Sequence, residues 1–255
     1  MNLPKVQFCI APKNETLSLL NYFLNPPKDS FDWSNIIFEF YPALKKRLEI
    51  AKDKKDRRKI TAGFFSDVYD QEKQVLLSNA ELFQEEWNKI NDRVMKALSD
   101  VVELAWPSDF KMFTARVSLN PICPRFIKKR VFDVFYRRTI RQMQAVSIHE
   151  LLHFIYFERW KTVFPDTKER EFDTPYLVWH LSEMVPGIIL NDPRIRGIVK
   201  NWKYHSYKEY EAIKINGISM LSRLQDLYDD RTSFATFLQE AWKFVQKNEK
   251  LITSI

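Results

Sequence analysis

The stretch from Thr139 to Trp160 constrains the fold of this chain more than any other. Its spacing predicts a helix with apolar residues on every side: Ile140, Met143, Ala145, Val146, Ile148, Leu151, Leu152, Phe154, Ile155 and Phe157. A helix that is apolar all round must be surrounded by protein, so we expect it at the centre of a hydrophobic core. The 255 residues of the chain are enough to build such a core without disulfides.

The apolar surface of this helix is interrupted by His149-Glu150-Leu151-Leu152-His153. Residues four apart project from the same face of a helix, so both imidazoles can reach one metal ion. Glu150 lies about 100° further around the helix, where it can contact a water on that metal without being a ligand. A chance meeting of core polar residues is the alternative. The cost of burying two histidines and an acid without a metal or other charges counts against it.

This motif on a buried helix resembles the active-site helix of the zincin metallopeptidases. In the metzincin branch a Gly and a third His follow at positions that are Tyr156 and Arg159 here, and the inverted HxxEH order is also absent. The resemblance is therefore to the gluzincins, whose third ligand is a Glu on a second helix downstream. It implies one Zn²⁺ per chain, held by His149, His153 and Glu183.

Glu183 is the candidate third ligand because it lies thirty residues after His153 in a mostly apolar stretch. Two histidines and one carboxylate leave the fourth position of zinc open, as in catalytic sites. His180 shares a helix face with Glu183 and is the rival ligand, or else supports the site from outside the ligand set.

Thermolysin-type gluzincins carry an Asp four residues after the Glu ligand, whereas this chain has Gly187 there. The resemblance therefore leaves the outer support of the site to other residues, and Asp173 or Asp192 can take that place.

The resemblance implies a peptidase that hydrolyses peptide bonds with a metal-activated water and Glu150 as general base. It also implies a His or Tyr downstream that stabilises the oxyanion. His205 is our candidate for this role, with Tyr204 and Tyr207 as alternates. In zincins the strand before the active-site helix binds extended substrate along its edge, and residues 112–119 fit that position.

The remaining pattern predicts an α+β fold, mainly helical, with a small mixed β-sheet next to the buried helix. Alternating residues predict strands at 6–10 and 113–119, and a possible further strand follows at 125–136. Helices are expected at 14–25, through 31–104, from 173 or 174 to 190, and in the tail at 207–247. The stripe Phe83, Trp87, Ile90, Val94 and Leu98 is typical of an amphipathic helix. We expect a mainly helical N-terminal region (1–105) and a zincin-like core with a helical C-terminal tail (106–255).

The composition narrows the classes of function and partner. Four glycines and no phosphate-binding glycine motif argue against nucleotide enzymes. The net charge of +7 includes a mixed-charge run at 52–59, which is typical of a solvated helix face rather than a nucleic-acid patch. A basic stretch at 128–141 could favour acidic peptide or protein substrates, or simply solubility.

The sequence contains no signal-peptide pattern and no apolar run of membrane-spanning length, so we expect a cytoplasmic protein. Two cysteines, Cys9 and Cys123, are too few for a disulfide scaffold. The alternative functions are a catalytically inactive zincin-fold binding protein and, with less support, a nucleic-acid-associated regulator.

Overall fold

The computed structural model describes residues 3–26 and 32–253, and these residues form two compact units. The sheet unit consists of Lys5–Lys89 and Met112–Ser147. The helical unit consists of Ile90–Lys111 and the chain from Ile148 onward, together with the N-terminal residues up to Pro4. Both units are discontinuous in sequence, and neither has a boundary at residue 105. Helices predominate and the sheet is small, which confirms the α+β class.

The sheet unit is built on a mixed sheet with the strand order β1-β2-β4-β3. The strands are β1 (Lys5–Ile10), β2 (Met112–Ser118), β3 (Arg125–Phe126) and β4 (Val131–Phe135). β1 and β4 each run parallel to β2, whereas β3 runs antiparallel to β4. Because β2 has a neighbour on both sides, the expectation that residues 112–119 offer a free edge to an extended peptide is wrong.

Four helices belong to the sheet unit: α1 (Lys13–Leu24), α2 (Ser34–Phe40), α3 (Pro42–Leu48) and α4 (Lys54–Asn88). The expected helical region begins at residue 31, which lies outside the described residues. Residues 54–59 of the mixed-charge run form the first turns of α4. The side chain of Asp53 caps the helix by accepting from the Asp56 N–H at 2.7 Å.

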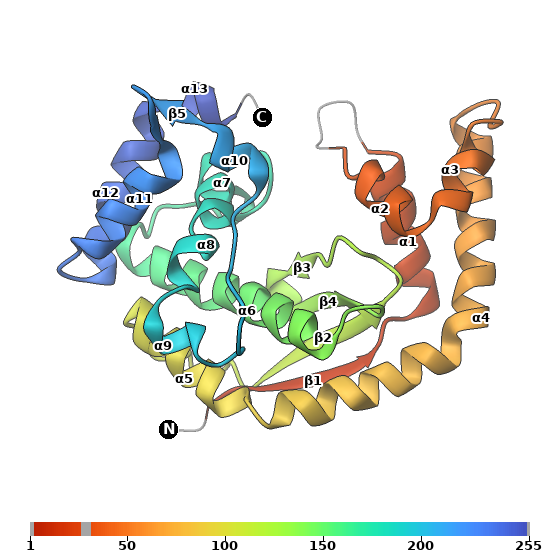
Figure 1. The fold of residues 1–255 in the computed structure, drawn as a ribbon, viewed down its shortest axis with the longest axis horizontal. Helices are drawn as coiled ribbons and strands as arrows, with labels where there is room; N and C mark the ends of the chain where they lie inside the picture. The colour runs from red at the N-terminus through yellow and green to blue at the C-terminus, as the bar shows by residue number, and fades with distance from the viewer. Residues whose placement is uncertain (1–2, 27–31, 254–255) are drawn as a thin grey trace. The chain divides into compact units, whose positions relative to one another are not determined.

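The long helix α4 runs beside β1 (Figure 1). The ring of Phe8 contacts the rings of Phe83 and Trp87, at centroid distances of 6.1 and 6.2 Å. The Gln84 side chain accepts from the Phe8 N–H at 2.8 Å and donates to the Val6 carbonyl at 3.1 Å. β1 is an edge strand of the sheet. The Gln84 amide makes two hydrogen bonds that the backbone of a further strand would otherwise make with β1.

The core helix α6 (Ile140–Val163) begins in the sheet unit and continues into the helical unit. Ile140 and Val146 are partly exposed, and the other apolar residues named for this helix are buried, as the sequence predicted. Within the described ranges, none of the helices combines the length and hydrophobicity required to span a membrane.

The other elements of the helical unit are short. They are α5 (Asn91–Val102), η2 (Glu169–Phe172), α7 (Leu177–Met184), α8 (Pro186–Ile189), α9 (Pro193–Arg196), α10 (Lys208–Ala212), β5 (Lys214–Ile215), β6 (Ile218–Ser219), α11 (Met220–Asp229), α12 (Phe234–Lys247) and α13 (Glu249–Ile252).

Four boundaries differ from the sequence-based expectation. The apolar stripe from Phe83 to Leu98 is divided between α4 and α5 by a break at residues 89–90, although all of its members are buried. The strand expected at 125–136 is interrupted by a 3-10 turn, and only 131–135 forms a full strand. The helix expected from Asp173 or Thr174 begins at Leu177 and has no side-chain cap. The tail contains a β5–β6 hairpin as well as helices.

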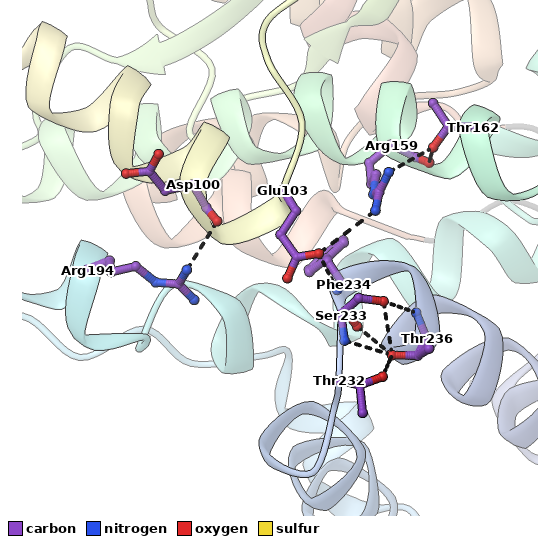
Figure 2. A network of polar contacts seen from close by, with 9 residues as sticks. All are labelled: Asp100, Glu103, Arg159, Thr162, Arg194, Thr232, Ser233, Phe234 and Thr236. Carbon is purple, nitrogen blue, oxygen red and sulfur yellow. Dashed lines mark hydrogen bonds and ion pairs between the residues drawn. The ribbon is translucent and has the colours of Figure 1, made fainter.

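A polar network joins four helices of the helical unit, and Glu103 is at its centre (Figure 2). One carboxylate oxygen of Glu103 accepts from the Phe234 N–H at the start of α12, at 2.9 Å. The same oxygen lies 3.9 Å from the guanidinium of Arg159 on α6. Arg194 of α9 donates to the Asp100 carbonyl on α5 at 3.1 Å. Glu103 thus links the end of α5 to α6 and α12, and Arg194 links α9 to α5.

Candidate metal centre

Helix α6 places His149 and His153 one turn apart, with their Nε2 atoms 3.0 Å from each other. The two rings meet edge to face at a centroid distance of 4.8 Å. The His153 side chain is 1% exposed and that of His149 is 24% exposed. The accessible side of this pair is therefore the side of His149.

Glu183, on α7, completes a cluster with these histidines. Its side chain is 2% exposed, and its two oxygens lie 3.7 Å from His149 Nε2 and 3.7 Å from His153 Nε2. The donor atoms of the three residues all lie within 4.8 Å of one another. Tetrahedral zinc with its usual bond lengths separates neighbouring ligand atoms by about 3.3 Å. The structure thus brings together the three residues predicted as ligands, in a buried cluster that could hold a metal ion.

The chemistry of this donor set fits a divalent transition metal. A carboxylate that is almost sealed from water is costly unless a positive charge compensates it. Two imidazole nitrogens and one carboxylate oxygen are ligands that zinc accepts, and three protein ligands leave one position for water or substrate.

The orientation of His153 is supported by a column of aromatic rings. Its ring stacks on Phe157 at a centroid distance of 6.0 Å, and Phe157 stacks on Phe172 at 4.4 Å. Phe172 comes from η2, the segment that precedes α7. The contacts of its ring with Phe157 and His149 limit the rotamers of His153 and help to fix its Nε2 atom.

Glu150 is buried and lies one residue along α6 from the candidate ligand His149. This is the position that helical geometry predicts for a group beside the metal rather than on it.

His180, the rival ligand, is not a member of the cluster. Its Nδ1 lies 2.9 Å from the hydroxyl of Tyr210. Burial lowers the pKa of His180, while the charge of Glu183 and a hydrogen bond to the Pro175 carbonyl oppose this shift. Nδ1 of His180 is thus engaged with Tyr210. Among the described residues, His149, His153 and Glu183 alone form a group with metal-ligand geometry.

The candidates for oxyanion stabilisation are spread over different environments. His205 is 66% exposed, and its Nδ1 lies 3.9 Å from a carboxylate oxygen of Glu211. Tyr204 is buried, whereas Tyr207 is exposed. The structure does not bring His205 into the cluster.

Tyr210 is the residue that the sequence did not single out. It is buried, it contacts His180, and the charge of Glu183 contributes to the raised pKa of its hydroxyl after the larger effect of burial. It stands in the charged stretch Lys208–Ala212, where no apolar periodicity indicates burial.

The two carboxylates expected to support the ligands have other surroundings. Asp192 accepts from Arg194 Nη2 at 2.7 Å and from the Tyr228 hydroxyl at 3.0 Å. Burial favours its neutral form, but these hydrogen bonds prevail and lower the pKa of Asp192 to about 2. Asp173 is exposed between η2 and α7.

At Gly187 a Cβ atom would lie 2.6 Å from Ser206 Oγ and 2.8 Å from Ser206 N, so no aspartate fits in this backbone arrangement.

Comparison of this chain with protein-family models, curated proteins and solved structures finds no match.

Proposed function

We propose that this protein is a zinc-dependent peptidase with His149, His153 and Glu183 as metal ligands and Glu150 as general base. The observation that carries the proposal is the buried His-His-Glu cluster, which has a second buried carboxylate next to it on α6. A purely structural metal site has no need for that second carboxylate. A peptide or protein is the proposed substrate, and the basic stretch at 128–141 would favour an acidic one.

Zinc in this position would lower the pKa of a bound water and polarise a substrate carbonyl. The protein groups have separate tasks. Glu150 accepts a proton from the attacking water and returns it to the leaving amine nitrogen as the C–N bond breaks, acting first as base and then as acid. Burial of His153 and Glu183 keeps bulk water away and strengthens the electrostatic interactions in the site. The role of His205 at the oxyanion stays a prediction.

Metal content and cleavage measured on the same samples test this proposal. Protein purified without chelator is analysed for zinc by mass spectrometry, and a peptide library is screened for cleavage. The variants are His149→Ala, Glu183→Ala and Glu150→Gln. The matched control is Glu158→Gln, because Glu158 lies on the same helix and pairs with Lys161 at 2.7 Å outside the cluster.

We expect one zinc per chain in the wild type, in Glu150→Gln and in Glu158→Gln, and loss of zinc in the two ligand variants. Cleavage should fall by about 10²–10⁴-fold in Glu150→Gln and stay unchanged in Glu158→Gln. A wild type that stays empty after zinc is added would refute the metal site. Zinc binding without cleavage of any peptide would refute the peptidase and leave a metal-binding protein.

A further inference from the structure

The segment Tyr204–Tyr210, which we call the clamp, crosses the helix that carries Glu183. Ser206 Oγ donates to the carbonyl of Met184, the residue after Glu183, at 2.7 Å. Four residues later, the Tyr210 hydroxyl meets His180 Nδ1 at 2.9 Å. The clamp therefore contacts α7 on both sides of the carboxylate ligand in sequence.

The beginning of the clamp is anchored to Asn191 by two hydrogen bonds. The Tyr204 N–H donates to Asn191 Oδ1 at 3.1 Å, and Asn191 Nδ2 donates to the Tyr204 carbonyl at 2.8 Å. Gly187 permits the close approach, because any side chain there would meet the backbone nitrogen of Ser206. The hydrogen bonds of Asn191 and the close packing at Gly187 thus hold the clamp against α7 and α8.

His180 is the link between the clamp and the ligand. It lies one turn before Glu183 on α7, and both side chains are buried. The Nδ1 atom of its ring lies 2.9 Å from the Tyr210 hydroxyl, within hydrogen-bond distance. Tyr210 thus contacts α7 through His180, one turn before Glu183.

We propose that Tyr210 is a positioning residue that acts through His180 to orient Glu183 toward His149 and His153. The inference rests on the metal site of the proposed function, and it adds a group that does not itself touch metal or substrate. The hydroxyl of Tyr210 is committed to His180, so its role is to hold the ligand-bearing face of α7.

Zinc affinity, measured by competition with a chromophoric chelator, tests this inference without any substrate. Removal of outer support typically costs 10–100-fold in metal affinity, and we expect Tyr210→Phe to weaken zinc binding about tenfold. The matched control is Tyr204→Phe. Tyr204 is a buried tyrosine of the same clamp whose hydroxyl makes no hydrogen bond to any described residue. Tyr204→Phe should bind zinc like the wild type.

Two further measurements separate positioning from general loosening of the fold. With Co²⁺ in place of zinc, the visible absorption spectrum should change in Tyr210→Phe and stay unchanged in Tyr204→Phe. His180→Leu should weaken zinc binding to a similar extent, and the double variant should be no weaker than either single variant, because both remove the same link. His180→Asn, which keeps a hydrogen-bonding group near the position of Nδ1, should restore part of the affinity.

Wild-type zinc affinity and an unchanged Co²⁺ spectrum in Tyr210→Phe would overturn the positioning role while leaving the metal site intact. Equal losses in Tyr204→Phe and Tyr210→Phe would overturn it as well, because packing rather than the hydrogen bond would then be responsible. A wild type that binds neither metal would instead refute the proposed function, and the positioning role with it. If Tyr210→Phe does not fold, additive losses in His180→Leu and Ser206→Ala would support a clamp with two contact points, and wild-type affinity in both would overturn it.

Discussion

His153 Nε2 and Glu183 Oε1 lie 3.7 Å apart, with only 1% and 2% of the two side chains exposed. They come from different helices and are thirty residues apart in sequence. Low-dielectric surroundings raise the cost of a carboxylate that no positive charge compensates. A bound cation would supply that charge and join α6 to α7.

Metal binding should therefore stabilise the fold. A ligand that binds only the native state adds about 2.7 kcal/mol to the free energy of unfolding when its concentration is 100 times Kd. We expect zinc to raise the Tm of the wild type and of Glu150→Gln, and a chelator to lower it again, in differential scanning fluorimetry. Glu183→Ala should not respond to either addition. An equal response of Glu183→Ala and wild type would show that zinc binds elsewhere.

Substitution of Gly187 should disturb the clamp. A Cβ atom at this position would lie 2.8 Å from the backbone nitrogen of Ser206, so Gly187→Ala forces the clamp away from α8. We expect a loss of about 1–3 kcal/mol in urea unfolding, together with weaker zinc binding. Gly197→Ala is the control, because a Cβ there meets nothing within 4 Å, and its effect should stay within about 0.5 kcal/mol. Similar values for the two variants would contradict the close packing at Gly187.

The buried Asp192 should make stability depend on pH in the acid range. Because the folded state lowers its pKa to about 2, from an ordinary value near 4, its ionised form stabilises the protein above pH 4. This contribution is lost as the pH falls through about 2. Asp192→Asn should cost on the order of 1–2 kcal/mol at pH 7, and less at pH 3, in urea unfolding. The exposed Asp226→Asn is the control, and a cost for Asp192→Asn that does not change with pH would contradict the assignment.

The network around Glu103 should contribute to the attachment of α12. Glu103→Ala leaves the N–H of the buried Phe234 without its acceptor and removes the partner of Arg159. We expect a loss of about 1–2 kcal/mol in thermal or urea unfolding. Glu103→Gln keeps an acceptor oxygen and should lose less. If both variants lose the same amount, the ion pair rather than the hydrogen bond is the stabilising contact.

Local patterns predicted the parts of this fold that depend on local physics. The core helix and the pair His149 and His153 follow from helical periodicity, and β1 and β2 follow from alternation. The turn of the β5–β6 hairpin could also have been predicted, because an Asn-Gly dipeptide favours hairpin turns. In the structure both Asn216 and Gly217 have the positive φ that such turns require.

Other features depend on contacts between distant segments and leave no local signal. The central position of β2 results from pairing with β1, whose partner residues are more than 100 positions away. The burial of Tyr210 results from its contact with His180 on another helix. No periodicity in a single stretch contains this information.

The parallel pairing of Lys5–Ile10 with Met112–Val117 has a consequence for how the chain can be divided. A fragment that ends at residue 105 would contain β1 without its neighbour, and a fragment that begins at 106 would leave one edge of β2 bare. Each fragment would expose backbone groups and apolar side chains that the other fragment buries in the intact protein. We therefore expect the two pieces to behave as halves of a split protein, which recover a native spectrum when mixed and aggregate when kept apart.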